Sequence, residues 1–451
     1  MTGEPQIHPG ETDEFAWHAT ENPLPEAADV AIVGGGIIGS SAAYFLARSG
    51  VSVALFEKGR IAGEQSGRNW GWVRQQCRSP VELPLMMQSL RLWQELPALL
   101  GEDVGFRQGG TLYLAEDAKE LEVLAEWLAV AREFALDTRI VTGRELKDVF
   151  AGGERWAGAL YTASDGRAEP SRAARAIARG AARAGARVLG RTAVRGIETA
   201  AGRISAVVTE HGRVSTRAVV CAAGAWSRLF CASLGVRVPQ LPLLGTVART
   251  APAPRLLEGQ AWSPAVAIRR RADGGYTVAH GHSSLHSIIP ASFRYAMKFM
   301  SAFREGHDSL RISFGGDFFR ALATGQLWPL DRPSPFERER VLNPKPEVRV
   351  LRQMRTALER WVPELASVPF VESWGGMIEA SPDVLPIISP VESIGDFYVA
   401  TGFSGHGFGI GPGAGKLIAG MVSGTVDPAA NAGFRLGRFF DGSPIVPGPA
   451  I

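Results

Sequence analysis

The apolar and polar positions near the N-terminus predict a strand, a helix and a second strand. Residues 28–33 form a short apolar run, residues 37–49 have the spacing of a helix that ends before Gly50, and residues 51–56 form another apolar run. Two strands joined to a helix through connections this short favour a right-handed βαβ unit with parallel strands. The sequence therefore predicts an α/β fold that begins with this unit.

Similar patterns extend the α/β prediction along the chain. Residues 240–346 contain many prolines and glycines with mixed periodicity, and residues 329–349 are loop-like. Apolar spacing predicts helices over 84–100, 116–135, 170–186 and near 347–361, and it predicts strands between 186 and 226, around PIISP and around DFYVATG.

Composition and charge place the chain among soluble globular proteins. With 451 residues, 45% of them hydrophobic and 21% charged, the chain can form two domains or one domain with a large insertion. The formal net charge of +3 is small for this length, so neither nucleic-acid binding nor attachment to an anionic membrane is predicted. Three cysteines without a CxxC pattern predict a reducing compartment, and the cytoplasm is the expected location.

The N-terminal region predicts neither export nor a transmembrane segment. Residues 1–28 are rich in Pro, Glu and Thr and are expected to form a surface arm, without the basic start and apolar core of a signal peptide. The longest apolar stretch, residues 30–47, is interrupted by glycines and serines. It is therefore predicted to be a buried strand, turn and helix rather than a membrane span.

The turn between the first predicted strand and helix matches a dinucleotide-binding fingerprint. Gly34, Gly36 and Gly39 have the GxGxxG spacing, and Glu57 ends the second strand about 20 residues later. We expect the glycines to allow a tight turn, close approach of a pyrophosphate and packing of helix on strand. Glu57 is expected to bind the adenosine ribose, and it disfavours NADP because it would repel a 2′-phosphate. A glycine-rich turn without a nucleotide is the alternative.

A second glycine-rich segment, TGFSGHGFGIGPGAGKL, runs from Thr401 to Leu417. Its GAGK resembles the end of a phosphate-binding Walker A loop, but the register excludes that motif. Ile410 occupies the position that requires Gly, and Leu417 occupies the position that requires Ser or Thr. A loop so poor in side chains is expected to lie against another ligand.

Six segments of the chain together resemble the D-amino-acid oxidase family of FAD-dependent amine oxidoreductases, which includes glycine oxidase, sarcosine oxidase and gamma-glutamylputrescine oxidase. They occur in the family's order and span most of the chain, except residues 250–345. The segments are ADVAIVGGGIIG, SGRN, DGRAEPSR, VVCAAGAWS, WGGMIEASPDVLPII and GFSGHGFGIGPGAGKLIAG. The resemblance implies FAD as the cofactor.

The resemblance also implies which residues contact FAD. In the family, the GFSGHG loop closes over the isoalloxazine ring, and the next helix, whose N-terminus we expect around Gly411–Lys416, points at the pyrimidine end. A helix N-terminus there would stabilise the negative charge of reduced flavin. Besides Gly34, Gly36, Gly39 and Glu57, the predicted FAD contacts are Ile37, Ile38, Lys58, Ser66, Gly67, Arg68, Asn69, Gly71, Val194, Ala223, Gly224, Gly376, Gly402, Gly405, His406 and Gly407.

Some relatives hold FAD covalently through a histidine behind the first βαβ unit or a cysteine before the TPD-like segment. The corresponding segments of this chain read SGRNWGW and ESWGGMIEASPD, with neither residue. Noncovalent FAD is therefore predicted.

Two residues are candidates for contact with the reacting substrate. Sarcosine oxidases of the family carry a lysine after GHGF that helps to hold the substrate carboxylate, and this chain has Gly409 there. Arg74, in WVRQQ, is the candidate for a carboxylate contact, with a solvated loop arginine as the alternative. His406 lies in the flavin loop, where we expect a structural hydrogen bond or a ring contact rather than proton transfer.

Aromatic and histidine residues supply candidates for the substrate pocket. Trp72, Trp374 and His282 are predicted to line it, with a place in the core as the alternative for the tryptophans. His280, His282 and His286 are closely spaced, but no carboxylate or cysteine joins them, so no metal site is predicted.

A row of arginines follows one face of the helix predicted over 170–186. Arg172, Arg175, Arg179 and Arg183 recur at helical spacing. Because the protein is nearly neutral, this row is interpreted as a solvated face rather than a nucleic-acid site.

The patterns and the resemblance together predict a discontinuous, Rossmann-like FAD-binding domain and a substrate domain of mixed sheet and helices. The FAD-binding domain is predicted to comprise residues 1–82, 141–238 and 366–451, and the substrate domain residues 83–140 and 239–365.

The resemblance implies oxidation of a C–N bond. An amine or amino acid would lose a hydride to flavin N5, the imine would be hydrolysed, and O₂ or another acceptor would reoxidise the flavin. Oxidation of a 2-hydroxy acid or another C–OH substrate is one alternative. A flavin-bearing subunit without turnover of its own is the other.

Overall fold

The chain folds around two large β-sheets and a small one. The computed structural model describes Phe15 and residues 22–448, so most of the arm predicted over residues 1–28 lies outside the described residues. The described strands form sheets of eight, ten and three strands. Within residues 22–448, no helix combines the length and the apolar composition that crossing a bilayer requires.

The eight-stranded sheet contains the predicted βαβ unit. Its strands are β1 (Ala27–Val33), β2 (Val53–Phe56), β9 (Arg187–Leu189), β10 (Val194–Ala200), β11 (Arg203–Thr209), β12 (Gly212–Cys221), β20 (Ile387–Pro390) and β21 (Phe397–Thr401), and the helix of the unit is α1 (Ile37–Arg48). The strand order is β10-β11-β12-β1-β2-β9, and β21 pairs with both β12 and β20. Because β1 pairs in parallel with β2 and β12, the predicted parallel βαβ unit is confirmed.

The central strand β1 is buried on both faces. Val30 and Ile32 belong to the apolar core that includes α1, whereas Ala31 and Val33 belong to the core on the opposite face. Burial on both sides is typical of a central parallel strand and explains its almost continuously apolar sequence.

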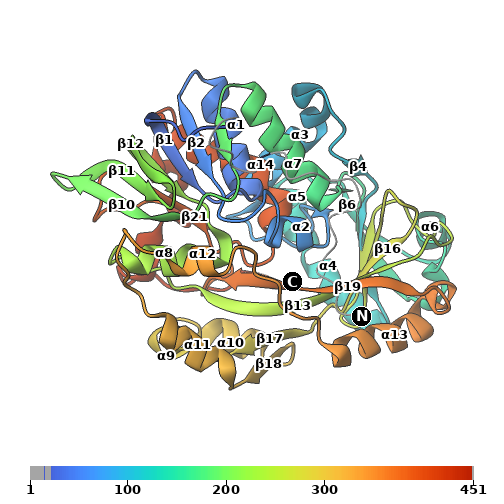
Figure 1. Ribbon diagram of the computed structural model, residues 1–451. Helices are drawn as coiled ribbons and strands as arrows, with labels where there is room; N and C mark the ends of the chain where they lie inside the picture. The colour runs from blue at the N-terminus through green and yellow to red at the C-terminus, as the bar shows by residue number, and fades with distance from the viewer. Residues whose placement is uncertain (1–14, 16–21, 449–451) are drawn as a thin grey trace.

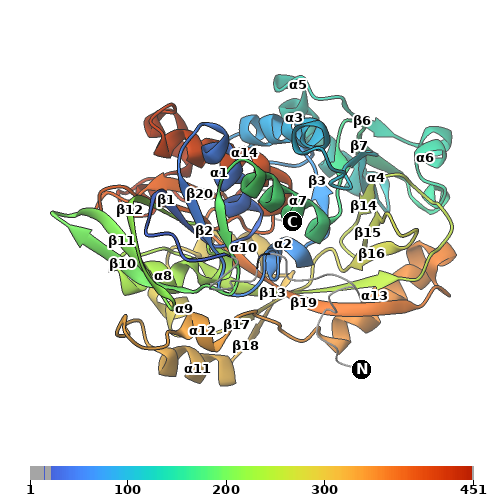
Figure 2. The same ribbon diagram turned by 45° about the horizontal axis from the view of Figure 1, so that its top comes forward.

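Four helices pack together on one face of this sheet (Figures 1 and 2). They are α1, α3 (Leu83–Leu100), α7 (Pro170–Arg183) and α14 (Gly407–Val422). Glycine permits the close approach of α14 to α1: a Cβ at Gly411 would lie 2.9 Å from Ile37 Cγ2, and a Cβ at Gly415 would lie 2.3 Å from Ser41 Cβ. The glycines around GAGK therefore serve helix packing.

Helix α14 begins at Gly407, earlier than the predicted start around Gly411–Lys416. The chain can continue as a helix through Pro412 because side chains of α3 bond the backbone groups beside it. Ser89 Oγ and Trp93 Nε1 donate to Gly409 O at 2.7 and 2.8 Å, and Gly413 N donates to Ser89 Oγ at 3.1 Å. These bonds replace helical hydrogen bonds that proline disturbs.

The ten-stranded sheet carries two long neighbouring strands, β13 (Leu241–Thr250) and β19 (Phe370–Ala380), which cross the molecule in Figure 1. The other strands are β5 (Thr111–Ala115), β6 (Thr138–Val141), β7 (Gly158–Thr162), β14 (Gln260–Trp262), β15 (Ala267–Arg270), β16 (Tyr276–Ala279), β17 (Ser284–Ser287) and β18 (Leu310–Ser313). The path is β18-β17-β13-β16-β15-β14-β5-β7-β6, with β19 paired to β13. The small sheet joins β3 (Trp72–Val73), β8 (Gly166–Arg167) and β4 (Arg107–Gln108).

Three predicted helices are confirmed as α3, α7 and α13 (Val348–Trp361). The helix predicted over 116–135 is instead two helices that meet at Trp127, whose Nε1 donates to Arg78 O at 3.3 Å and fixes the bend. The further helices are α2 (Gln65–Arg68), α4 (Ala118–Glu126), α5 (Leu128–Glu133), α6 (Gly143–Val149), α8 (Ser227–Ser233), α9 (Pro290–Tyr295), α10 (Met300–Gly306), α11 (Gly316–Thr324) and α12 (Pro335–Arg338).

The strands of the two large sheets can be compared with the predicted domain division. All strands of the eight-stranded sheet fall in the segments predicted for FAD binding. However, β7 and β19, which fall in the same segments, pair with β5 and β13 in the ten-stranded sheet. The chain thus passes between the sheets more often than the predicted boundaries assume, and the division remains a prediction.

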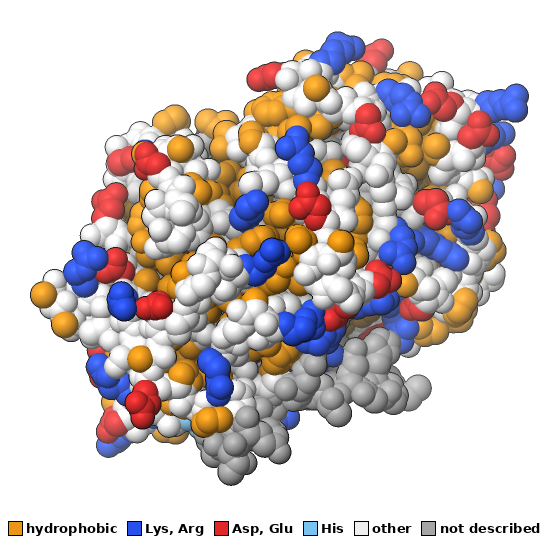
Figure 3. Space-filling view, turned by 90° about the horizontal axis from the view of Figure 1, so that it is seen from above, with side chains coloured by type: hydrophobic (Ala, Val, Ile, Leu, Met, Phe, Trp, Pro, Cys, Tyr) orange, Lys and Arg blue, Asp and Glu red, His pale blue; other side chains and the backbone are white. Residues whose placement is uncertain are grey.

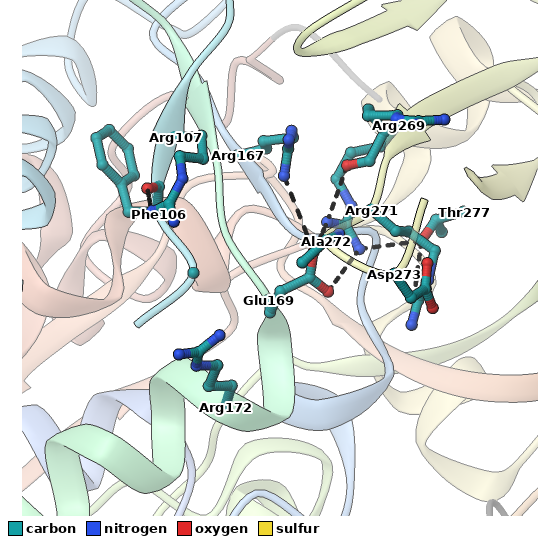
Figure 4. A network of polar contacts seen from close by, with 12 residues as sticks. Phe106, Arg107, Arg167, Glu169, Arg172, Arg269, Arg271, Ala272, Asp273 and Thr277 are labelled. Carbon is teal, nitrogen blue, oxygen red and sulfur yellow. Dashed lines mark hydrogen bonds and ion pairs between the residues drawn. The ribbon is translucent and has the colours of Figure 1, made fainter. Parts of the chain in front are cut away.

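An ion-pair network joins α7 to the ten-stranded sheet (Figure 4). Arg269 on β15 is fully buried, and its Nη1 donates to Glu169 Oε1 at 2.9 Å just before α7 begins. Ala272 N donates to the same oxygen at 2.9 Å. Burial opposes ionisation of Glu169, but the Arg269 charge and hydrogen bond lower the pKa of this carboxyl to about 2. The network therefore ties the helical layer to the second sheet through an ionised carboxylate.

The arginine row of α7 is paired with acidic residues at its exposed edge. Arg179 and Arg183 form salt bridges with Glu102, and Arg172 forms one with Asp103. The face of the molecule seen in Figure 3 carries basic and acidic side chains interspersed with apolar ones. Neither observation indicates a surface dominated by positive charge.

Candidate active site

The fingerprint glycines form a compact turn between β1 and α1. Gly34 has a φ of +111°, and a Cβ there would lie 2.4 Å from Ala222 O at the end of β12. A Cβ at Gly39 would lie 2.0 Å from Gly34 O, so only glycine lets the helix pack this closely on the turn. The turn therefore holds the N-terminus of α1 at the carboxyl end of β1, where nucleotides bind open parallel sheets.

Polar side chains organise the backbone around this turn. Glu57 accepts hydrogen bonds from Gly35 N at 2.8 Å and from Gly59 N at 2.7 Å, and Ser66 Oγ accepts one from Ile37 N at 2.8 Å. Burial raises the pKa of Glu57, and the neighbouring Lys58 opposes that shift. A carboxylate can accept further bonds on the same oxygens, so Glu57 retains capacity for ribose hydroxyls.

Lys58 forms an ion pair, a hydrogen bond and a ring contact within the protein. Its Nζ lies 2.6 Å from Glu64 Oε1, donates to Glu339 O at 2.8 Å, and lies 4.4 Å from the centre of the Trp226 ring. The lysine therefore holds the segment that precedes α13 against the nucleotide turn.

A cavity extends from this turn to the glycine-rich loop before α14, and most of the predicted contacts line it. The predicted residues on its wall are Gly34, Gly36, Ile37, Ile38, Glu57, Lys58, Ser66, Arg68, Asn69, Trp72, Arg74, Val194, Ala223, Gly224, Gly376, Gly405 and Gly407. The predicted residues that do not line it are Gly39, Gly67, Gly71, His282, Trp374, Gly402 and His406.

The predicted residues away from the cavity wall have structural contacts. Trp374 Nε1 donates to Arg68 O at 2.9 Å, which fixes α2 against β19. The His282 ring lies 5.0 Å from that of Trp262, whereas His280 lines the cavity. A Cβ at Gly67 would lie 2.3 Å from Ala62 O, so this glycine allows close packing of the backbone.

The loop before α14 has an unusual backbone. Gly402, Ser404 and Gly405 have φ values of +68°, +50° and +83°, in the left-handed region. Ser404 N donates to Glu379 O at 3.0 Å, and Ser404 Oγ accepts from Ser381 N at 3.0 Å, so β19 and its continuation support the loop. Gly405 of this loop and Gly407, the first residue of α14, line the cavity.

A buried group of charged side chains anchors the same loop. The His406 Nδ1 atom lies 3.1 Å from Glu82 Oε2, and the two side chains are 2% and 0% exposed. Burial, reinforced by the positive Arg78, lowers the pKa of His406 to about 4. The imidazole is therefore neutral near pH 7 and donates its Nδ1–H to the Glu82 carboxylate.

Arg74 and Arg78 bring two buried guanidinium groups to the cavity wall. Each side chain is 3% exposed, and both line the cavity. Arg74 Nη1 donates to Gln76 O, and its guanidinium lies 5.5 Å from the centre of the Tyr113 ring. Arg78 Nη1 is buried without a hydrogen-bond partner among the described residues. Buried cationic donors with spare capacity favour an anionic ligand.

Asp165 holds the backbone that directly follows Arg74, just beyond β3. It accepts hydrogen bonds from Gln75 N at 2.7 Å and Gln76 N at 3.3 Å. Burial raises the pKa of Asp165 to about 6, although these hydrogen bonds and Arg74 oppose the shift. The carboxylate thus fixes the backbone of Gln75 and Gln76 next to the arginine.

Three residues that sequence reasoning missed belong to this site. Arg78 and Glu82 lie in CRSPVELP, where no motif marks them, and only the fold brings them to His406. Glu379 stands in WGGMIEASPD and lines the cavity with 5% exposure. An acidic residue within an otherwise apolar strand pattern was the signal that could have found it.

Burial is the cause that raises the pKa of Glu379. It raises the pKa of this carboxyl to about 7, and the hydrogen bonds from its own N–H and from Phe403 only reduce the shift. The remaining wall near the loop is largely apolar and aromatic. It includes Trp70, Trp72, Met377, Ile378, Phe403 and Phe408.

The fold and the cavity define a dinucleotide-dependent enzyme of the Rossmann-like class. The DAO family model, described as FAD dependent oxidoreductase, matches residues 29–421. The chain therefore belongs to this family, and its cofactor is FAD.

Known structures and sequences support the same family. The structure of L-amino acid deaminase from Proteus myxofaciens, in complex with anthranilate, is similar with a TM-score of 0.87 and 35% identity over 92% of this chain and 94% of that chain. Sarcosine oxidase subunit beta from an Arthrobacter species is 26% identical over 96% of this chain and 95% of its own length.

Other relatives are much longer than this chain. Human mitochondrial sarcosine dehydrogenase is 29% identical over 226 residues, which are 48% of this chain and 25% of that protein. The chain spans less than half the length of several of the curated relatives it matches.

Proposed function

We propose that this protein oxidises a C–N bond of an amino acid or related amine with noncovalently bound FAD. The observation that carries the proposal is the placement of the buried Arg74 and Arg78 on the same cavity wall as the loop of Gly405 and Gly407. Bound FAD supplies the two-electron oxidation, and the chain's own residues bind and orient the substrate.

The residues present fit FAD at both ends of the cavity. The N-terminus of α1 and Gly36, which lines the cavity without a side chain, suit the pyrophosphate, and Glu57 suits the adenosine ribose. At the other end, the left-handed Gly405 and the N-terminus of α14 leave room and positive partial charge beside the ring site. Gly376 lines the cavity without a side chain that could form a covalent link.

Arg74 is the residue that would hold a substrate carboxylate. Its guanidinium is fixed by the Gln76 carbonyl and the Tyr113 ring, so little side-chain entropy is lost when a carboxylate binds. The aromatic wall around Trp72 and Phe408 would exclude water and accept an apolar side chain. After oxidation, the imine would be released and hydrolysed to the carbonyl product and ammonia or an amine.

The names of the similar proteins point in the same direction. L-amino acid deaminase, sarcosine oxidase and glycine oxidase each act on an amino acid by name. The same arginine contact also suits a 2-hydroxy acid, and that class remains the alternative, together with a flavin-bearing subunit without turnover.

The electron acceptor and the location are part of the proposal. O₂ or a protein or membrane carrier would reoxidise the flavin. All three cysteines are free thiols, two of them buried, which supports the proposed cytoplasmic location.

Anaerobic titration tests this function. Purified holoprotein is mixed with a panel of amino acids, amines and 2-hydroxy acids, and the flavin absorbance is followed. Bleaching by amino acids or amines supports the proposal, and bleaching by 2-hydroxy acids alone replaces it with the alternative. Arg74→Met should weaken binding of the reducing amino acid more than it slows the saturated rate of reduction.

A further inference from the structure

We propose that Glu379 binds the amino group of the substrate in the cavity and takes the proton that this nitrogen must lose before the C–N bond is oxidised. The proposal rests on the amine oxidation proposed above and names the residue that prepares the nitrogen. It concerns a side chain of β19 that is not among the predicted FAD or substrate contacts.

The Glu379 carboxylate has free hydrogen-bonding capacity toward the cavity. Among the described residues, Phe403 N donates a hydrogen bond to Glu379 Oε1 at 3.4 Å. Pro242, opposite on β13, has no N–H to offer. A carboxylate accepts about four hydrogen bonds, so most of its acceptor positions remain for a ligand in the cavity that it lines.

Glu379 and Arg74 contact the same glycine-rich segment from different ends. Glu379 meets it at Phe403 and Ser404. The backbone of Arg74 approaches it at Gly409, where a Cβ would lie 3.6 Å from Arg74 N. Both residues line the same cavity, which therefore presents a carboxylate and a guanidinium, the groups that complement the ammonium and carboxylate of an amino acid.

The charged groups on neighbouring elements are bonded elsewhere. Asp383, beyond the end of β19, is bonded to Arg438, and Arg68 of α2 donates to Asn343 and Gly375 O. His406 on the adjacent loop is paired with Glu82. None of these charges is among the causes that shift the pKa of Glu379. The substrate ammonium would thus provide a counter-charge for this carboxylate.

Oxidation of an amine requires that its nitrogen first lose a proton. An ammonium nitrogen has no lone pair with which to form the C=N bond, so one proton must leave first. The transfer converts R–NH₃⁺ and the Glu379 carboxylate into R–NH₂ and the Glu379 carboxylic acid, with no change in electron count. The two electrons leave afterwards with the hydride, for which FAD is the oxidant. Burial raises the pKa of Glu379 to about 7, near the pH at which proton transfer is most effective.

The test compares Glu379→Gln with the parental holoprotein. For an amine that bleaches the parental flavin, the second-order rate constant of anaerobic reduction is measured from about pH 5 to about pH 10. The parental constant should rise through about pH 7. In Glu379→Gln that rise should disappear, leaving a rise toward the pKa of the free amine. The loss near neutral pH should be roughly 100-fold, and alkaline pH should restore much of the rate.

Two variants and one spectroscopic measurement make the result decisive. Glu372→Gln, on the same strand but paired with Arg249 away from the cavity, should keep the parental profile. Glu379→Asp retains a carboxylate and should keep the rise near pH 7 even if Glu379→Gln binds FAD poorly. Infrared titration should show a carboxyl group that ionises near pH 7 in the parental protein and not in Glu379→Gln.

The experiment distinguishes a failure of the proposed function from a failure of the proposed role of Glu379. If no amine bleaches the parental flavin, the proposed function fails. If an amine does so and Glu379→Gln keeps the rise near pH 7 or the parental rate, amine oxidation stands and the role of Glu379 is wrong. Loss of that rise in Glu379→Asp, with normal FAD content, would also overturn the proposal.

Discussion

The neutral imidazole of His406 donates its Nδ1–H to the Glu82 carboxylate at 3.1 Å, both side chains being fully or almost fully buried. This bond joins the glycine-rich loop before α14 to the start of α3, which lie 324 residues apart in sequence. The Glu82 carboxylate also balances the buried Arg78, whose positive charge helps to lower the pKa of Glu82. The pair therefore fixes the loop and the charge of the cavity wall together.

Glu82→Gln should destabilise the fold. Glutamine can still accept the His406 hydrogen bond, but it leaves Arg78 without its counter-charge. We expect the free energy of unfolding at about pH 7 to fall by roughly 1–3 kcal/mol, the cost of losing a buried charged hydrogen-bond partner. Urea unfolding measures this change, with Glu95→Gln on the exposed face of α3 as the control.

The effect of Glu82 should depend on pH. Burial alone would raise the pKa of Glu82, but His406 and Arg78 lower it to about 2, below the ordinary value of 4.5. Its stabilising contribution is therefore present above pH 4.5 and is lost as the pH falls toward 2. The difference between the parental protein and Glu82→Gln should shrink over that range. A difference that stays constant would contradict the assigned charge.

Glu57→Arg should severely weaken FAD binding. The substitution removes the acceptor expected for the ribose hydroxyls and also the bonds from Gly35 N and Gly59 N that shape the nucleotide turn. The chain should still fold, less stably, because its cores do not include Glu57. The ratio of FAD to protein after purification is the measurement, and parental occupancy would show that Glu57 is not the ribose ligand.

Gly405→Val or Gly407→Val should slow reduction of the flavin more than it reduces FAD content. Valine at Gly405 must adopt a φ of +83°, and a Cβ at Gly407 would lie 3.1 Å from Phe403 Cβ. The nucleotide turn lies at the other end of the cavity and is unchanged. Anaerobic stopped-flow measurements at equal FAD content test this expectation. Gly316→Val, where a Cβ meets no atom within 4 Å, is the control, and parental rates in both loop variants would remove the loop from the ring site.

Acid precipitation should release FAD into the supernatant. The histidine and cysteine through which some relatives hold FAD are absent from SGRNWGW and ESWGGMIEASPD, and the cavity wall between Gly376 and Glu379 carries no cysteine or histidine. Absorbance of the supernatant and of the redissolved pellet gives the distribution. Flavin that stays in the pellet would establish a covalent bond.

Glu169→Gln should destabilise the junction between α7 and the ten-stranded sheet (Figure 4). The fully buried Arg269 would lose its ionised partner, with an expected cost of about 3–5 kcal/mol. Because the pKa of Glu169 is about 2 against the ordinary 4.5, this stabilisation is present above pH 4.5 and lost toward pH 2. Denaturant unfolding measures it, and an unchanged midpoint at neutral pH would contradict the prediction. Folded Glu169→Gln should reduce its flavin at the parental rate, since Glu169 does not line the cavity.

The sequence by itself determined the nucleotide turn, because its parts are local. Gly34, Gly36 and Gly39 lie within six residues, and the following strand brings Glu57 beside them through one short connection. The periodicity of α3, α7 and α13 was equally local and was read correctly. By contrast, the resemblance implies a flavin-facing helix end around Gly411–Lys416, and only the packed structure places Gly411 and Gly415 against α1.

Only the tertiary structure decided the charge arrangement of the cavity. Arg74, Arg78 and Glu82 come from one end of the chain and Glu379 and His406 from the other, and no spacing rule links them. Their protonation states depend on burial and on one another, as in the neutral His406 beside the ionised Glu82. The spacing of residues along the sequence predicts contacts between residues that are close in the chain. Electrostatic interactions in a low-dielectric interior depend instead on which residues, distant in sequence, the fold brings within a few ångströms of each other.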